Sequence, residues 1–190
     1  PSSKTPRIQE IHALMIHSFC RAIEDEIFNK AQFTDLPAKK IISAEEINQL
    51  AQAIKGYRSV FTNGCFDILH PGHVFILNEC RKHGELLIVG LNTDNSVKRL
   101  KGDSRPYHKF ADRAAVLAAL ECIDYVVGFD EDTPKEIIEA LTPKILIKGG
   151  DYNENTVVGA DWVKKNGGEV IIIPLLEGHS TTSILKDSKK

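Results

Sequence analysis

Two histidines three residues apart form the part of the sequence best suited to chemistry. His70 and His73 end the run Thr62-Asn63-Gly64-Cys65-Phe66-Asp67-Ile68-Leu69-His70-Pro71-Gly72-His73, which follows a short apolar segment. Pro71 suits the first turn of a helix, and positions three apart lie on one helix face. A helix N-terminus favours an anion, and Gly72 lets a phosphate approach the backbone. The pattern therefore predicts an anion site with paired imidazoles.

A structural role, as helix caps or core residues, is the alternative interpretation of the two histidines. The run contains neither the GxGxxG of a dinucleotide site nor the GxxxxGK[ST] of a P-loop. A lone histidine is more often structural than catalytic. Two histidines around a Pro-Gly pair, where a strand gives way to a helix, favour the anion site.

A group of cations follows in the next part of the chain. Six basic residues lie within sixteen positions, opposed locally only by Asp103 and Asp112: Lys98, Arg99, Lys101, Arg105, Lys109 and Arg113. A triphosphate and a sugar phosphate would balance this charge, whereas the structural alternative is a solvated helix face. Arg105 is the more specific candidate, because a guanidinium binds phosphate through two parallel hydrogen bonds.

Two later segments also have the composition of ligand-binding loops. Lys148-Gly149-Gly150-Asp151 follows an expected strand, where glycines permit close approach and Asp151 accepts hydrogen bonds; an ordinary glycine turn is the alternative. Ser180-Thr181-Thr182-Ser183 opens an expected terminal helix, and its hydroxyls and free N–H groups predict a second anion site. Simple capping by Ser180 is the alternative there.

The elements that must position these residues alternate along the chain. The hydrophobic pattern predicts strands at 59–62, 86–91, 123–127, 144–147 and 170–173. It predicts helices at 71–82, 93–100, 110–120, 133–141 (with Thr133 as cap and Pro134 first) and 160–165, and a helix at 43–55 that opens with a Ser43–Glu46 capping box and ends at Gly56. Such alternation indicates βαβ units and a doubly wound parallel α/β sheet, which binds ligands at the carboxyl ends of its strands.

The first 42 residues read as a separate N-terminal helical extension and linker, and residues 43–190 as the main domain. Apolar residues recur at spacings of three and four over 6–29, which predicts an amphipathic helix. Its apolar stripe would pack on the domain or form a dimer interface, and a homodimer is expected.

Composition excludes several classes of protein. The chain has 190 residues, 42% hydrophobic and 26% charged, with a net charge of −2, so neither nucleic acid nor a membrane is an expected partner. It has no apolar run long enough for a transmembrane helix and no apolar secretory segment. Its four cysteines form no CxxC pair, which favours reduced thiols in the cytoplasm.

These motifs together resemble a known family. HxGH after a strand is similar to the nucleotidylyltransferase superfamily. The longer run 61–73, with Lys98-Arg99-Leu100-Lys101-Gly102-Asp103-Ser104-Arg105-Pro106, Lys148-Gly149-Gly150-Asp151-Tyr152 and Ser180-Thr181-Thr182-Ser183-Ile184, resembles the D-glycero-β-D-manno-heptose 1-phosphate adenylyltransferases (ADP-heptose synthases) over about residues 41–186. HxGH alone indicates the superfamily. The strings Lys-Gly-Asp-Ser-Arg-Pro and Lys-Gly-Gly-Asp-Tyr indicate the heptose 1-phosphate adenylyltransferases within it.

The resemblance implies a Rossmann-like nucleotidyltransferase fold that transfers AMP from ATP to a sugar 1-phosphate and releases pyrophosphate. It implies a catalytic set of His70, His73, Lys101 and Arg105. Nucleotide contacts would come from Thr62, Asn63, Gly64, Cys65, Phe66, Asp67, Gly72, Lys98, Lys148, Gly149, Gly150, Asp151, Ser180, Thr181, Thr182 and Ser183. No carboxylate cluster predicts a metal cage, so Mg²⁺ is expected on the nucleotide phosphates.

Two other functions stay open from the sequence. One is a sister cytidylyltransferase that acts on a small phosphorylated alcohol such as glycerol 3-phosphate, sharing HxGH and the terminal Ser-Thr-Thr. The other is a non-catalytic nucleotide-binding module. Familiar members of the heptose family often carry a sugar-kinase domain first. About 40 residues precede the resemblance here, so a stand-alone transferase is expected.

Overall fold

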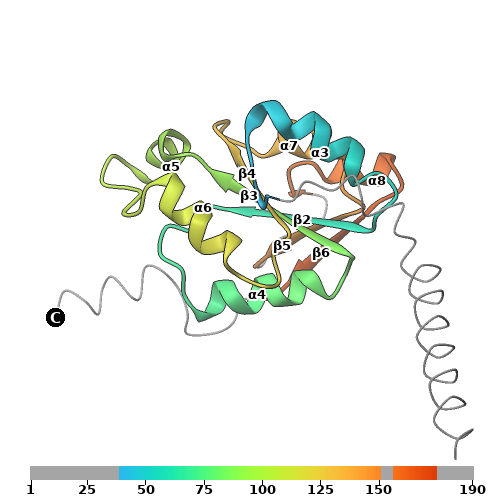
Figure 1. The fold of residues 1–190 in the computed structure, drawn as a ribbon, viewed down its shortest axis with the longest axis horizontal. Helices are drawn as coiled ribbons and strands as arrows, with labels where there is room; N and C mark the ends of the chain where they lie inside the picture. The colour runs from blue at the N-terminus through green and yellow to red at the C-terminus, as the bar shows by residue number, and fades with distance from the viewer. Residues whose placement is uncertain (1–38, 151–155, 175–190) are drawn as a thin grey trace, which may run out of the picture. The chain divides into compact units, whose positions relative to one another are not determined.

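The computed structural model describes residues 39–150 and 156–174, which build one six-stranded sheet covered by helices (Figure 1). The strands are β1 (Ile41–Ile42), β2 (Ser59–Gly64), β3 (Leu86–Asn92), β4 (Tyr125–Phe129), β5 (Ile145–Gly149) and β6 (Glu169–Ile173). The helices are the 3₁₀ turn η1 (Ala44–Glu46), α3 (Ile47–Ala53), α4 (Pro71–Arg81), α5 (Asp94–Lys101), α6 (Phe110–Ala118), α7 (Lys135–Leu141) and α8 (Ala160–Lys165). Within these ranges, no helix is long and apolar enough to cross a bilayer.

The strand order is β1-β4-β3-β2-β5-β6, and every neighbouring pair is parallel. The chain runs outward from β2 through β3 to β4, then returns to place β5 on the other side of β2. This reversal makes β2 and β5 the topological switch point, where an open α/β sheet binds its ligands beyond the carboxyl ends of the strands. The doubly wound parallel sheet predicted from the sequence is confirmed.

Helices cover both faces of the sheet, so β3 is apolar from Leu86 to Leu91, before the polar Asn92 that ends it. All seven residues of β3 are buried, as its continuous apolar run predicts. α4 and α6 share one core cluster with β2 and β3, through residues such as Leu77 and Leu117. α3, α7 and α8 lie on the other face, in contact from one to the next (Figure 1).

The structure differs from the predicted elements at several places; β4, for example, runs over Tyr125–Phe129, two residues later than the strand expected at 123–127. Ile41 and Ile42, expected in the linker, form β1 beside β4; two residues are too few to show a period. The segment expected as one helix at 43–55 starts as a 3₁₀ turn, although the predicted capping box is present, with the Ser43 N–H donating to Glu46 Oε2 at 3.0 Å. α7 begins at Lys135 rather than Pro134, and no side chain caps it. The helices expected at 6–29 and from Ser180 onward lie outside the described residues.

Replacement of Leu50 by alanine tests the core between α3 and the sheet. Leu50 is fully buried, and such a change removes contacts and leaves a cavity. We expect Leu50→Ala to lower the free energy of unfolding by about 2–5 kcal/mol in urea denaturation. The control is Val116→Ala, at a half-exposed position of α6, which should change it by less than about 0.5 kcal/mol. Equal losses in both variants would contradict the packing described.

Candidate functional site

A tight turn joins the end of β2 to the start of α4 and carries most of the predicted site. Gly64 is the last residue of β2, and Phe66 turns the chain with a positive φ of 44°. His70 is the N-cap of α4, and its carbonyl oxygen accepts from the His73 N–H at 2.9 Å. Gly72 is buried in the first helical turn. The two histidines therefore stand at a helix N-terminus, as predicted.

The imidazoles of His70 and His73 stack on one another. Their ring centroids are 3.8 Å apart with an interplanar angle of 27°, and the Phe66 ring lies 5.1 Å from that of His73. Burial, followed by the charges of His70 and Lys101, lowers the pKa of His73 to about 4, against a smaller opposing effect of the Ile68 backbone. The site thus disfavours a second positive charge until an anion enters it.

Two pockets adjoin this turn. One, of about 440 Å³, is bounded by Leu69, His70, Pro71 and Val74. The other, of about 260 Å³, lies between the 66–69 turn and α6. The first gives a ligand access to the side of His70.

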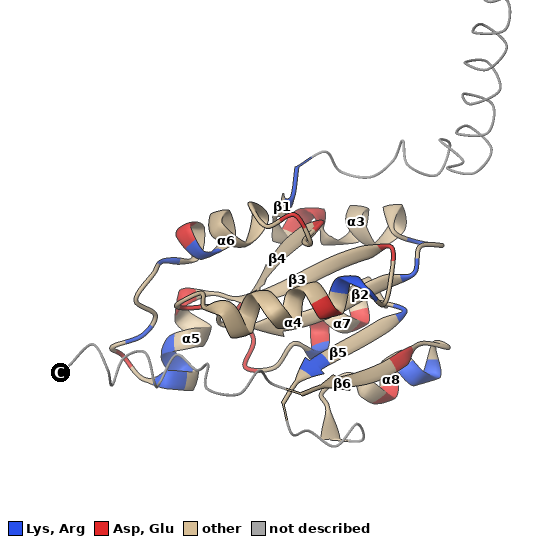
Figure 2. Cartoon of the chain, turned by 90° about the horizontal axis from the view of Figure 1, so that it is seen from below, with Lys and Arg blue, Asp and Glu red and all other residues tan. Residues whose placement is uncertain are grey.

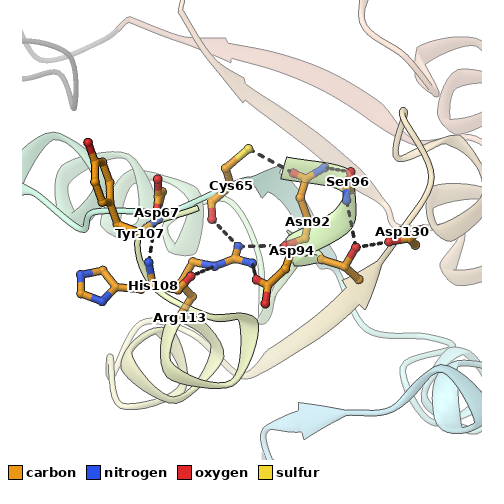
Figure 3. Close-up of polar contacts among 10 residues, drawn as sticks. Cys65, Asp67, Asn92, Asp94, Ser96, Tyr107, His108, Arg113 and Asp130 are labelled. Carbon is orange, nitrogen blue, oxygen red and sulfur yellow. Dashed lines mark hydrogen bonds and ion pairs between the residues drawn. The ribbon is translucent and has the colours of Figure 1, made fainter. Parts of the chain in front are cut away.

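Asp67 lies inside the protein and anchors the loop between α5 and α6. Its Oδ1 accepts from the backbone N–H of Tyr107 at 2.6 Å and of His108 at 3.2 Å (Figure 3), and its Oδ2 pairs with Arg105. Arg105 also lies over the Tyr107 ring. Arg105 was expected to bind phosphate, and the structure gives one of its nitrogens a protein carboxylate as partner. The side chain of Asp67, expected beside the nucleotide, is buried, and its contact with the nucleotide stays a prediction.

The cation group is smaller than the sequence indicates, because acids outside it neutralise three of its members, one of them Arg105 through Asp67. Arg99 pairs with Asp130 and Asp132, and Arg113 pairs with Asp94. A count of acids within the sixteen positions misses these partners, which lie elsewhere in the chain. Lys98 and Lys101 remain exposed on the last turn of α5, where basic residues gather (Figure 2). Lys109 is exposed as well.

At the switch point, one hydrogen bond between side chains links the ends of β2 and β5. Lys148 Nζ donates to Asn63 Oδ1 at 2.8 Å, and burial lowers the pKa of Lys148. Gly149 ends β5, and Gly150 continues the chain with φ +125° while its N–H donates to the Ile173 oxygen. Thr62, by contrast, is only 3% exposed within β2. Its expected contact with the nucleotide stays a prediction.

A polar network at the end of β3 was not predicted. Asn92 accepts from Cys65 Sγ at 3.8 Å and donates through Nδ2 to Ser96 Oγ at 2.9 Å (Figure 3). Ser96 in turn donates to the Glu131 oxygen, and the Thr93 hydroxyl accepts from the Ser96 N–H. The only sign of this network in the sequence is the polar run Asn-Thr-Asp directly after the apolar residues of β3. The network fixes the start of α5, which carries Lys98 and Lys101.

Part of the predicted site lies outside the described residues: Asp151 and all of Ser180, Thr181, Thr182 and Ser183. Across 39–150 and 156–174, no three His, Cys, Asp or Glu side chains are grouped so as to hold a metal ion.

Removal of the Asp67 carboxylate tests its role as an anchor. Asp67→Ala leaves Arg105 largely buried without its partner and two backbone N–H groups unsatisfied. We expect a loss of roughly 3–5 kcal/mol in the free energy of unfolding. The amides of Tyr107 and His108 should also exchange faster with solvent. Asp112→Ala, an exposed acid on α6, is the control, with a loss below about 1 kcal/mol. Unchanged amide protection in Asp67→Ala would refute the anchoring role.

Comparison with known proteins places this geometry in a family. The family model described as Cytidylyltransferase-like matches residues 61–184. The protein named Bifunctional protein HldE from Helicobacter hepaticus is 51% identical over 151 residues, 80% of this chain and 30% of that protein. The protein of the same name from Syntrophotalea carbinolica is 46% identical over 186 residues, 97% of this chain and 35% of that protein. The second match extends into the first 42 residues, for which the resemblance offered no counterpart. The chain spans about a third of the length of these relatives.

Solved structures agree on the fold. The lipopolysaccharide core biosynthesis protein from Thermoplasma volcanium has a TM-score of 0.54 at 27% identity, over 65% of this chain and all of that one. A pantoate-beta-alanine ligase from Francisella tularensis shares the fold alone, with a TM-score of 0.52 at 13% identity over 80% of this chain and 77% of the other. With a family model over most of the chain and relatives at about half identity, the chain belongs to the cytidylyltransferase-like family and is a nucleotidyltransferase.

Proposed function

We propose that this chain transfers AMP from ATP to a sugar 1-phosphate, with D-glycero-β-D-manno-heptose 1-phosphate as the acceptor. The observation that carries the proposal is the stacked His70–His73 pair at the N-terminus of α4, beside the switch point of the sheet. Similarity to HldE proteins and to a lipopolysaccharide core biosynthesis protein supports a sugar phosphate as acceptor.

The reaction needs no nucleophile or base from the protein. An oxygen of the sugar 1-phosphate, already anionic, attacks the α-phosphorus of ATP in line and forms the new P–O bond. The bond from the α-phosphorus to the bridging oxygen breaks, and pyrophosphate leaves with that oxygen. Catalysis then consists of positioning the two substrates and stabilising charge on the transferring and leaving phosphates.

The histidine pair supplies donors where that charge develops. His73 is neutral near pH 7 in the free protein, because its pKa is about 4, and a neutral imidazole keeps one N–H to donate. A polyphosphate beside the rings favours the charged form, so its binding raises the pKa of His73. The same residue therefore holds the phosphates more strongly once they are in place.

Cations on two sides would complete the phosphate site. Lys101 is near enough for its charge to act on His73, and it would bind the β- and γ-phosphates together with Lys98. Lys148, held by Asn63, would contact the nucleotide from the β5 side. Mg²⁺ would enter with ATP as part of the substrate, bound mainly to phosphate oxygens, as is usual for this ion.

A cytidylyltransferase is the second candidate function, favoured by the description of the matching family model. It would use the same histidines and the same in-line displacement, with CTP and a small phosphorylated alcohol such as glycerol 3-phosphate. We further propose that the protein acts in the cytoplasm, since ATP and sugar phosphates are cytoplasmic substrates. We also propose that it forms a homodimer. Sedimentation of the purified chain tests the dimer.

Pyrophosphate release in the presence of Mg²⁺ tests both functions. ATP, CTP and GTP are each combined with D-glycero-β-D-manno-heptose 1-phosphate, its α-anomer and glycerol 3-phosphate. We expect turnover with ATP and the β-anomer. Turnover only with CTP and glycerol 3-phosphate would replace the first function by the second, and bound nucleotide without turnover of any pair would refute both.

The variant His73→Gln tests the catalytic role of the pair. Loss of one donor to the developing charge should lower kcat by about 10²–10³-fold. His83→Gln removes a histidine just beyond the other end of α4 and should keep the wild-type rate. A near-normal kcat in His73→Gln would show that His73 is structural.

A further inference from the structure

Arg113 is a buried cation whose hydrogen bonds are almost fully committed. It lies in the first turns of α6, and its side chain is 1% exposed. Nε donates to the His108 oxygen at 2.9 Å, and Nη1 donates to the oxygens of Cys65 at 2.6 Å and Asn92 at 2.8 Å (Figure 3). Nη2 donates to Asp94 Oδ1 at 2.8 Å. Four of the five N–H groups of a guanidinium are thus used within the protein.

The four acceptors come from three different segments that carry the proposed phosphate contacts. Cys65 begins the turn that leads to His70 and His73. Asn92 and Asp94 flank the N-cap of α5, the helix of Lys98 and Lys101. His108 belongs to the loop of Arg105. One side chain therefore fixes the backbone of all three segments, although no hydrogen bond or ion pair described above joins it to any of those phosphate-binding side chains.

His108 shows how firmly the loop between α5 and α6 is held. Its N–H donates to Asp67, and its carbonyl oxygen accepts from Arg113 (Figure 3). Asp67 lies two residues after Cys65, in the turn that Arg113 also holds. The turn and the loop are therefore joined twice, once by an acid and once by a base, and neither can shift without breaking a buried charged contact.

We propose that Arg113 is a positioning residue for nucleotidyl transfer: it sets the relative placement of the histidine turn, α5 and the Arg105 loop without touching substrate. The inference rests on the proposed function. A misplacement of about 1 Å between such groups lowers a rate by about a hundredfold. Lysine cannot replace this arginine, because an ammonium lacks the planar fork that reaches several acceptors at once.

The variant Arg113→Lys tests the proposal with the substrates that the wild type turns over. Its kcat should fall by about a hundredfold. The Kd for ATP–Mg²⁺, measured by calorimetry without acceptor, should change less than threefold. Leu50→Ala is the matched control, because it weakens the core on the other face of the sheet and leaves the histidine turn, α5 and the Arg105 loop intact. Below its melting temperature it should keep the wild-type kcat.

Several results would overturn the proposal. One is a wild-type kcat in Arg113→Lys; another is a kcat loss of equal size in folded Leu50→Ala, since stability alone would then explain the effect. A third is an unchanged kcat with a weakened Kd for ATP, which would make Arg113 a binding residue. If Arg113→Lys does not fold, Asp94→Ala replaces it: its carboxylate is partly exposed, and a tenfold loss of kcat is expected where a wild-type kcat would refute the proposal.

Amide hydrogen exchange separates this proposal from the proposed function. Arg113→Lys should speed exchange at 65–69 and 103–109 and leave the centres of β2 and β3 unchanged. Absence of turnover in the wild type would refute the proposed function, whatever the exchange data. Unchanged exchange at 65–69 and 103–109 would refute the positioning role, whatever the substrates.

Discussion

Two buried charges, the carboxylate of Asp67 and the guanidinium of Arg113, hold the polar segments above the sheet in one arrangement. Burial of an ion costs free energy unless partners satisfy it. Asp67 has three donors around it, and Arg113 has four acceptors. Most of those partners are backbone groups of loops, which the sheet itself does not order. Asp67 and Arg113 therefore hold in place the segments that carry the two histidines and the lysines of α5.

The position of the histidine pair depends on that support, and the low tendency of His73 to carry charge depends on its burial. The imidazole of His73, stacked at 3.8 Å on that of His70 and partly buried, does not readily carry charge. A helix N-terminus and a nearby lysine make the same place attractive to an anion. The free protein thus has a site that favours an anion, as the proposed phosphate contacts require. This is the preorganisation that phosphoryl transfer requires of a protein, since no covalent step is assigned to it.

The sequence predicts the elements well where one strong pattern decides them. The apolar run of β3 and the bounds of α8 agree with the structure, and so does the placement of His70 and His73 at a helix start. Ile41 and Ile42 were missed because only their pairing with β4 makes them a strand. The ion pairs of Asp67, Arg99 and Arg113 were not predicted for a related reason. Their partners lie 19 to 48 residues away along the chain, except for the carbonyl of His108, and a local count of charges cannot contain them.

The most direct test of the account is the pKa of His73 with and without nucleotide, measured by NMR of ¹⁵N-labelled imidazoles. The free protein should give a value of about 4. With a non-hydrolysable ATP analogue and Mg²⁺ bound, the pKa of His73 should rise toward or above the ordinary histidine value of about 6.5. Affinity for the analogue should then increase as the pH falls through that range, since the complex binds the extra proton. A pKa of His73 that is unchanged in the saturated complex would contradict the claim that the histidine pair holds the nucleotide phosphates.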